Sequence, residues 1–306
     1  MRRPPRWVEV DALPMRAAID AVERALREGL DPHADPDRQR LALSDAGHFL
    51  LMESIHGPYA GVKLTTVAPG NPARGLPRIQ GVYVLFAAET LTPVALMDGA
   101  AITALRTPAV SAVAARHLVT ATPGRLVVFG TGPQASGHIE ALRIALPALD
   151  RVEVIGRGRG NTERFAADHD AASAFGDTER AVREADVICC CTSARTPLFD
   201  GSLVRDGATV IAIGSHEPSA YELDSALVGR ATVVAESRTT ALREAGDVIQ
   251  AFEDELLTEA DLIYIDSLVR GEAEAALSHT RPRVFKSAGM AWEDLVVATA
   301  AWERTR

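Results

Sequence analysis

The sequence predicts an α/β protein with two domains, one of which contains a doubly wound parallel sheet of the Rossmann type. Two patterns support this prediction: consecutive short strand patterns in the first third of the chain, and strands that alternate with helices from residue 126 onward. The third observation is the length of 306 residues, which suits two domains of roughly 100–200 residues each.

The first region combines two helices with a sheet. Apolar residues recur at helical spacing over 14–29 and over the alanine-rich segment 99–118. Short apolar strand patterns lie between them, at 48–52, 61–67, 81–86 and 93–97. Strands that follow one another without intervening helices predict an antiparallel or mixed sheet.

The second region alternates strands with helices. The strand patterns cover 126–129, 152–155, 187–191, 209–213 and 232–235, and the helix patterns cover 135–146, 161–169 and 178–184. This alternation is typical of parallel sheets with helices on both faces. A short strand at 284–285 and a helix at 290–302 follow.

The composition narrows the classes of function. Hydrophobic residues make up 47% and charged residues 24% of the chain, which is ordinary for a folded globular protein. The net charge of −9 disfavours nucleic acid and anionic membranes as partners, because both require a basic surface. No apolar run reaches the ~18–20 residues that span a bilayer, and none of signal-peptide length follows the basic start. We therefore expect a cytoplasmic protein.

The three cysteines of the chain are consecutive, at Cys189, Cys190 and Cys191. Neighbouring residues of a strand point to opposite faces, so three in a row are poorly arranged to chelate an ion. The histidines show no metal-ligand spacing such as H-E-x-x-H. We interpret the cysteines as buried thiols in a reducing compartment and expect no catalytic metal.

The strongest local signal is the turn between strand 126–129 and the helix that follows it. It reads Gly130-Thr131-Gly132-Pro133-Gln134-Ala135, the G-x-G-x-x-A pattern of dinucleotide-binding turns. The first glycine permits a tight turn, the second allows close approach of a pyrophosphate, and the alanine lets the helix pack near the sheet. The helix N-terminus offers unpaired N–H groups to the phosphates. We predict that these six residues bind a dinucleotide.

The end of the second strand of this region distinguishes NAD from NADP. An acidic residue there would bind the ribose 2′-hydroxyl of NAD, but this chain has Gly156-Arg157-Gly158-Arg159 after the strand. The guanidinium groups of Arg157 and Arg159 suit a 2′-phosphate. We therefore favour NADP(H) as the cofactor, with NAD(H) as the alternative.

A series of short motifs runs along the chain. They are Gly61-Val62-Lys63, Asn71 in a Gly/Pro loop, Met97-Asp98-Gly99, Ile102-Thr103-Ala104-Leu105-Arg106-Thr107, the Gly130–Ala135 turn, Glu222-Leu223-Asp224, Glu244-Ala245-Gly246-Asp247, Val284-Phe285-Lys286-Ser287 and Glu293-Asp294. In the order and spacing of these motifs the chain resembles the ornithine cyclodeaminase/mu-crystallin family over nearly its whole length.

The resemblance implies a fold and a class of chemistry. The Rossmann domain, 121–283, would be inserted into a substrate-binding domain formed by 1–120 plus 284–306, through which the chain would form a homodimer. The family exchanges hydride between a nicotinamide and the α-carbon of an amino acid or its imine. Its members catalyse ornithine cyclodeamination to proline, alanine dehydrogenation or ketimine reduction, and some mainly bind ligands.

The resemblance also implies roles for single residues. Lys63 matches the active-site lysine of the family, and Arg106 matches the arginine that binds the substrate carboxylate. A second carboxylate-binding arginine matches Arg38, although Arg40 fits nearly as well because the preceding loop varies in length. Ser287 falls where the family places a residue near the nicotinamide.

The chain departs from the family at three positions. The cyclodeaminases and alanine dehydrogenases carry an aspartate where this chain has His216, and a family glutamate is replaced by Leu50. Arg78 stands where cyclodeaminases have a threonine, and we count it among the substrate-binding candidates. The distal amine of ornithine needs an acidic partner, so these departures disfavour ornithine cyclodeamination but not the redox chemistry.

Reduction of an imine at an α-carbon requires a fixed carboxylate, a general acid and a bound hydride donor. Arg106, together with Arg38, would fix the carboxylate through bidentate hydrogen bonds. Lys63 or His216 would protonate the imine nitrogen. Repulsion from the two arginines, helped by burial, should lower the pKa of Lys63, whereas a histidine titrates near neutrality without tuning.

These residues predict an NADP(H)-dependent reductase of cyclic ketimines, such as pyrroline- or piperideine-carboxylates, or a related amino-acid dehydrogenase. The substrate would be small, amino-acid-like and carry a carboxylate. One alternative is an ornithine cyclodeaminase with tightly bound NAD, in which Glu217 would replace the missing aspartate. The other is a protein that binds the cofactor or a ligand without turnover, against which the presence of Lys63 and Arg106 argues.

Overall fold

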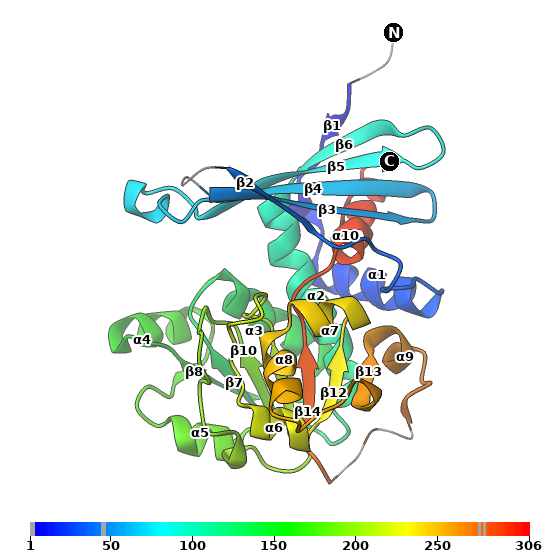
Figure 1. The fold of residues 1–306 in the computed structure, drawn as a ribbon. Helices are drawn as coiled ribbons and strands as arrows, with labels where there is room; N and C mark the ends of the chain where they lie inside the picture. Colours follow the sequence, from blue (N-terminus) through cyan, green and yellow to red (C-terminus); the bar gives the residue numbers. More distant parts are fainter. Residues whose placement is uncertain (1–3, 44–46, 275–276, 278–279) are drawn as a thin grey trace. The chain divides into compact units, whose positions relative to one another are not determined.

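The chain divides into two compact units in the computed structural model, which describes residues 4–43, 47–274, 277 and 280–306 (Figure 1). Unit 1 comprises Met1–Thr107 and Met290–Arg306, and unit 2 comprises Pro108–Gly289. The units therefore divide after residues 107 and 289, whereas the sequence-based domain boundaries lie after residues 120 and 283. The binding role of each domain stays a prediction.

Unit 1 contains one mixed sheet and the helices that cover it. Its elements are β1 Arg6–Trp7, η1 Val10–Ala12, α1 Met15–Arg27, β2 Gln39–Leu43, β3 Gly47–His56, β4 Tyr59–Val67, η2 Pro72–Arg74, β5 Ile79–Ala87, β6 Thr92–Asp98, the first part of α2 Gly99–Leu118, and α10 Ala291–Glu303. The strand order is β1-β6-β5-β4-β3-β2, antiparallel except for the parallel pair of β1 and β6. Helix α10 packs against β3 and β4, and α1 packs against α10.

The alternation of side chains along β4 explains how a lysine becomes buried. Tyr59, Gly61, Lys63 and Thr65 are buried, and the residues between them are half-buried. Successive side chains of a strand point to opposite faces, so these four share one face. Since α10 packs against β4, Lys63 lies on a covered face of the sheet and requires a polar partner there.

Unit 2 contains the predicted doubly wound sheet. Its elements are the second part of α2, β7 Arg125–Phe129, α3 Pro133–Ala145, β8 Arg151–Ile155, α4 Arg159–Asp168, β9 Ala172–Ser173, α5 Thr178–Glu184, β10 Val187–Cys190, η3 Gly201–Leu203, β11 Thr209–Ala212, α6 Ser225–Arg230, β12 Thr232–Ala235, α7 Arg238–Arg243, α8 Gly246–Glu253, η4 Glu259–Asp261, β13 Leu262–Tyr264, α9 Ile265–Val269 and β14 Arg283–Lys286. The order is β13-β12-β14-β11-β10-β7-β8-β9, and every pair is parallel. The Rossmann-type prediction is confirmed. None of the helices in the described part of the chain is long and apolar enough to cross a membrane.

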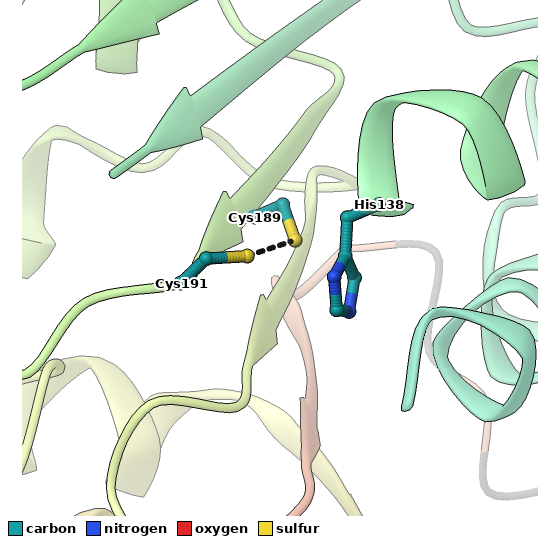
Figure 2. A group of neighbouring side chains, drawn as sticks. All are labelled: His138, Cys189 and Cys191. Carbon is teal, nitrogen blue, oxygen red and sulfur yellow. Dashed lines mark hydrogen bonds between the residues drawn. The ribbon is translucent and has the colours of Figure 1, made fainter. Parts of the chain in front are cut away.

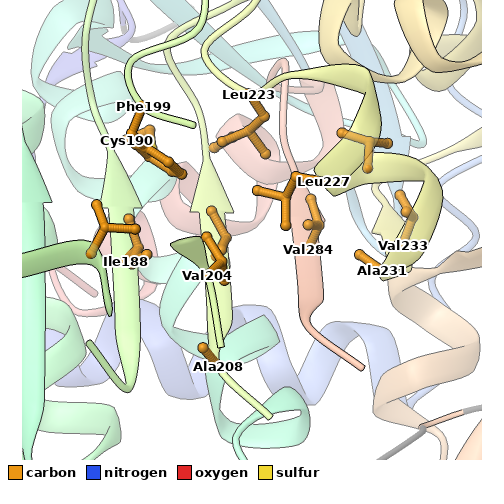
Figure 3. Packing of buried hydrophobic residues seen from close by; sticks show 14 of the residues in the cluster. Ile188, Cys190, Phe199, Val204, Ala208, Leu223, Leu227, Ala231, Val233 and Val284 are labelled. Atoms are coloured by element: carbon orange, nitrogen blue, oxygen red, sulfur yellow. The ribbon is translucent and has the colours of Figure 1, made fainter. Parts of the chain in front are cut away.

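The three cysteines lie at the carboxyl end of β10 and alternate between the two faces of the sheet. The sulfur atoms of Cys189 and Cys191 are 3.5 Å apart and lie beside His138 of α3 (Figure 2). Cys190 points the other way, into the hydrophobic core that also contains Ile188 and Val284 (Figure 3). Adjacent cysteines point to opposite faces, as the sequence predicted. Cys189 and Cys191, however, are two residues apart and therefore share a face, which that prediction did not take into account.

Candidate active site

A buried ionic cluster in unit 1 joins Lys63 of β4 to residues of α2 and α10. The Nζ atom of Lys63 donates to Oδ1 of Asp294 at 2.9 Å and to Oγ1 of Thr103 at 3.1 Å, and it lies 2.7 Å from Oδ2 of Asp294. Nη1 of Arg106 donates to Glu293, and its Nε lies 3.2 Å from Oδ1 of Asp294. All four charged side chains are buried, so each depends on the others for compensation.

Helix α2 places two of these side chains on the same side. The carboxylate of Asp98, the last residue of β6, accepts hydrogen bonds from the backbone N–H groups of Ala100 and Ala101 at 2.7 and 3.1 Å, which caps the helix. Thr103 and Arg106 follow at a spacing of three residues, which puts them on one helical face. The motif that begins at Asp98 therefore encodes a helix start and the two side chains that the helix delivers to Lys63.

The glycine two residues before the lysine has a packing role. A Cβ atom on Gly61 would overlap the hydroxyl group of Tyr83, the residue of β5 that pairs with Lys63. Burial, with the charges of Asp294 and Asp35, raises the pKa of the Tyr83 hydroxyl well above its ordinary value. The short motif Gly61–Lys63 therefore places a neutral phenol beside the ionic cluster.

The environment of Lys63 makes its ammonium group a proton donor near neutral pH. Burial lowers the pKa of Lys63 to about 8; Asp294 opposes this effect, and the positive charges of Arg106 and Arg38 add to it. The direction agrees with the sequence-based expectation, but desolvation rather than repulsion is the main cause. A lysine with such a pKa exchanges its proton readily at physiological pH.

Asp35 is a titratable residue near this cluster that the sequence did not single out. Its carboxylate accepts a hydrogen bond from the backbone N–H of Trp292 at 2.5 Å, which ties the loop before β2 to the start of α10. Burial, partly offset by hydrogen bonds from Ser54 and Trp292, raises the pKa of Asp35 to about 6. Asp35 and Glu53 also line a cavity of about 470 Å³. The loop sequence Asp31–Asp37 carries three aspartates, and nothing in it distinguishes the half-buried Asp35 from the two exposed ones.

Arg38, Arg40 and Arg78, the other candidates for binding the substrate, lie in different environments. Arg38 is half-buried in the loop before β2 and close enough to lower the pKa of Lys63. Arg40 is exposed on β2, with Nη2 3.4 Å from Nδ1 of His48. Arg78 is exposed and lies just before β5, next to Ile79, which pairs with Val67 of β4. Val67 is four residues from Lys63 along β4, a distance of roughly 13 Å along the strand. Proximity therefore favours Arg38 over Arg40 and leaves Arg78 apart from the cluster.

The predicted dinucleotide turn in unit 2 has the geometry that its glycines imply. Gly130 has φ +117°, and a Cβ atom there would lie 2.6 Å from the carbonyl oxygen of Cys191. Nothing lies within 4 Å of a Cβ position on Gly132, so the backbone is open to a bound group. Pro133 begins α3, which has no side-chain cap at its N-terminus, and Ala135 is fully buried. An uncapped helix N-terminus beside an open glycine fits the pyrophosphate of a dinucleotide.

The rest of the turn is held by the first turn of α4 and the loop that precedes it. The side chain of Asn161 donates to Oγ1 of Thr131 at 2.7 Å, and a Cβ atom on Gly156 would lie 2.5 Å from Oγ1 of Thr162. Arg157 and Arg159 are both exposed. The guanidinium group of Arg159 lies 4.9 Å from the ring centroid of Phe175 and 3.5 Å from Glu163, so it is already engaged on the surface of α4.

Buried ionic groups also organise the carboxyl ends of the strands in unit 2. Nζ of Lys286 donates to the carbonyl oxygen of Ser215 at 2.9 Å and lies 2.7 Å from Oδ2 of Asp247. The next residue after Ser215 is His216, which is exposed, while Ser287 is buried and donates its backbone N–H to β11. Lys286 therefore holds the loop that carries His216.

A buried glutamate fixes the neighbouring loops in the same way. Glu222 accepts hydrogen bonds from the backbone N–H and the hydroxyl of Thr192 at 2.8 and 2.7 Å, and from the N–H of Gly214 at 2.8 Å. Its own N–H and that of Leu223 donate to Asp247 at 2.7 and 2.9 Å. The motifs that contain Glu222 and Asp247 thus shape the loops of this edge, a role that the sequence alone did not reveal.

Comparison with known proteins identifies the family. The chain matches the profile of the ornithine cyclodeaminase/mu-crystallin family over residues 7–306. The chain belongs to this family. It is 34% identical over 251 residues to Delta(1)-pyrroline-2-carboxylate reductase of Bacillus cereus, a match that covers 80% of this chain and 77% of the relative.

Solved structures extend the similarity to the whole fold. The Delta(1)-pyrroline-2-carboxylate reductase of Thermococcus litoralis, in complex with NADH and L-proline, aligns with a TM-score of 0.89 at 26% identity, over 98% of this chain and 97% of that chain. An archaeal alanine dehydrogenase dimer with bound NAD aligns with a TM-score of 0.90 at 27% identity, over 98% and 96%. The predictions of the family and of a nicotinamide-dependent oxidoreductase are confirmed.

Proposed function

We propose that this protein reduces a small cyclic ketimine that carries a carboxylate next to the C=N bond, with pyrroline-2-carboxylate as the first candidate. The observation that carries the proposal is Lys63, a buried ammonium group with a pKa near 8 that lies among Asp294, Arg106 and Arg38. An imine becomes a better hydride acceptor when its nitrogen is protonated, and Lys63 has the protonation equilibrium that this step requires. The names of the Bacillus and Thermococcus relatives support the same substrate class.

The arginines would hold the substrate. Arg106 is oriented by Glu293 and Asp294, and a guanidinium group fixed in this way loses little entropy when it binds a carboxylate. Arg38 would be the second contact, since it lies near enough to Lys63 to affect its pKa. His216 stays a candidate for a second proton donor, placed by the Lys286–Ser215 hydrogen bond.

The Gly130–Ala135 turn would hold the dinucleotide, which supplies the hydride when bound. The turn offers the α3 N-terminus to the pyrophosphate, and Thr131 is held by Asn161. NADP(H) is our first choice because Arg157 follows β8 where an acidic residue would select NAD. We further propose that the protein acts in the cytoplasm and as a homodimer; the archaeal alanine dehydrogenase is a dimer.

The test is the consumption of NADPH by the purified protein, followed by absorbance, with pyrroline-2-carboxylate and with piperideine-2-carboxylate. NADH is run in parallel. Turnover of either imine is expected, faster with NADPH. If neither imine is reduced with either cofactor, the proposal is wrong. Ammonia release from ornithine would then indicate a cyclodeaminase, and dinucleotide binding without any turnover would indicate a binding protein.

A further inference from the structure

Three potential metal ligands meet on one face of the unit 2 sheet. The Sγ atoms of Cys189 and Cys191 and a ring nitrogen of His138 all lie within 4.8 Å of one another (Figure 2). Cys189 and His138 are fully buried, and Cys191 is partly exposed at the end of β10. Cys189 lies on β10, Cys191 follows directly after the end of that strand, and the histidine lies on α3.

The hydrogen bonds of His138 determine which ring nitrogen could bind an ion. Its Nδ1 atom lies 2.7 Å from the carbonyl oxygen of Gln134, and a carbonyl can only accept, so Nδ1 carries a hydrogen. In the neutral ring Nε2 then has the lone pair, which accepts a hydrogen bond from the hydroxyl of Ser111 at 2.9 Å, so an ion bound at Nε2 would replace this hydrogen bond. An imidazole whose other nitrogen donates to a backbone carbonyl is the usual arrangement of histidines that bind metal ions.

The spacing of the two sulfur atoms also matches a metal site. Two thiolates that bind Zn²⁺ tetrahedrally at about 2.3 Å have sulfur atoms about 3.8 Å apart, close to the observed 3.5 Å. Thiolate and imidazole ligands prefer soft or borderline cations to Mg²⁺ or Ca²⁺. Binding would release the two thiol protons, and burial raises the pKa of both thiols, so the protons compete with the ion.

We propose that Cys189, Cys191 and His138 form a binding site for a thiophilic divalent cation, with Zn²⁺ as the physiological candidate. Three protein ligands leave the fourth tetrahedral position to water or another small ligand.

The site is linked to the dinucleotide turn by direct contacts. The carbonyl oxygen of Cys191 is the atom that a Cβ on Gly130 would approach to 2.6 Å, and the N–H of Cys191 donates to Phe129 at 2.8 Å. Gln134, whose carbonyl orients His138, is itself a residue of the turn. We therefore expect occupancy of the metal site to change the affinity for the dinucleotide, and by linkage the reverse. This coupling, unlike the metal site, rests on the proposed cofactor site.

The metal site is tested with Cd²⁺ as a probe, because cadmium thiolates give a charge-transfer absorption in the ultraviolet. Purified protein is treated with a chelator, dialysed and titrated with Cd²⁺, and Zn²⁺ is then added as a competitor. We expect one Cd²⁺ per chain with this absorption and its loss on addition of Zn²⁺. Cys189→Ala and Cys191→Ala should each lower the affinity at least about 100-fold.

Cys190→Ala is the matched control, because Cys190 lies between the two ligands but points into the core on the other face. It should keep the absorption and the stoichiometry; Cys190→Val replaces it if the smaller side chain prevents folding. The proposal is overturned if the wild-type protein gives no cadmium–thiolate absorption, or if Cys190→Ala loses it as completely as Cys191→Ala.

The coupling is measured separately, as the Kd for NADPH with and without saturating Zn²⁺, from nucleotide fluorescence. We expect a change of at least about fivefold in the wild-type protein and none in Cys189→Ala. An unchanged Kd in the wild-type protein overturns the coupling and leaves the cadmium result standing. Absence of NADPH and NADH binding in both states overturns the proposed cofactor site instead.

Discussion

Two buried lysine–aspartate pairs occur in this protein, one in each unit, and they differ in what surrounds them. Lys63 and Lys286 each lie 2.7 Å from an aspartate Oδ2, of Asp294 and Asp247 respectively. Lys63 has Arg106 and Arg38 close by and a hydroxyl, that of Thr103, as its further acceptor. Lys286 instead donates to a backbone carbonyl, that of Ser215.

The difference in neighbours supports the proposed chemical role of Lys63 and favours a structural role for Lys286. Positive charges beside Lys63 make its proton easier to remove, and the hydroxyl partner can give way to a substrate atom. A backbone carbonyl offers Lys286 a fixed acceptor, and the aspartate that pairs with it is bound to two further backbone N–H groups. Distance between charges alone therefore does not distinguish a catalytic lysine from a structural one.

The largest expected effect is on turnover. Lys63→Met should lower kcat roughly 10²- to 10⁴-fold, because the group that protonates the imine nitrogen is lost. Steady-state kinetics with NADPH and pyrroline-2-carboxylate measure this change. The Kd for NADPH, from fluorescence, should stay unchanged; turnover within a factor of about two of the wild type would remove Lys63 from the mechanism.

The second prediction concerns stability, for which the substitution of Lys286 should have a larger effect than that of Lys63. Lys286→Met should lower the free energy of unfolding by about 3–5 kcal/mol, because it leaves the carboxylate of Asp247 buried without a counter-ion. Lys63→Met should cost less, because Asp294 keeps its contact with Arg106. Urea unfolding of both variants gives the comparison, and equal losses would contradict the distinction between the pairs.

The third effect concerns the pH dependence of imine reduction. If Lys63 acts as the proposed general acid, its protonated form is the active one and kcat/KM should fall as the pH rises through about 8. Asp294→Asn removes a charge that raises this pKa, so the decline should move to lower pH by about one unit. Glu293→Gln is the control, since Glu293 contacts Arg106 rather than Lys63. A shift to higher pH in Asp294→Asn would show that another group controls the profile.

The smallest expected effect tests the cofactor preference. Arg157→Ser should weaken NADPH binding about tenfold and leave NADH binding unchanged, because only NADPH carries the 2′-phosphate. Arg159→Ser should have less effect, since Arg159 is engaged with Phe175 and Glu163. Equal Kd values for NADPH in wild type and Arg157→Ser would favour NAD(H) as the cofactor.

The long and regular elements could be predicted from the sequence, and so could some short ones, such as the helix at 178–184, but other short elements could not. Helices 14–29 and 99–118 have enough turns for a periodic pattern, whereas α6 to α9 have only five to eight residues each. The edge strands β1 and β9 contain two residues each, too few to show an alternation of polar and apolar side chains. The doubly wound sheet was predictable because alternation of strand and helix is a property of the chain order alone.

Some residues of the candidate site could be recognised from a local pattern in the sequence, and others only from the folded chain. The Gly130 turn is a local pattern, so sequence suffices to find it. The partners of Lys63 are not local: Asp294 is 231 residues away, and nothing near either residue announces the other. The resemblance drew attention to Glu293 and Asp294 as a motif, but only the folded chain shows that they compensate Lys63 and Arg106.

The discontinuity of unit 1 sets an order of events during synthesis. All of unit 2 is translated after Lys63 and before α10. Lys63 therefore lacks its counter-ion Asp294 until the residues after Gly289 have been synthesised. A nascent chain can thus form the Gly130–Ala135 turn while Lys63 still lacks Asp294. Chains that stop before α10 would lack Glu293 and Asp294, the acidic partners of Arg106 and Lys63, so the buried ionic cluster can form only after unit 2 has been translated.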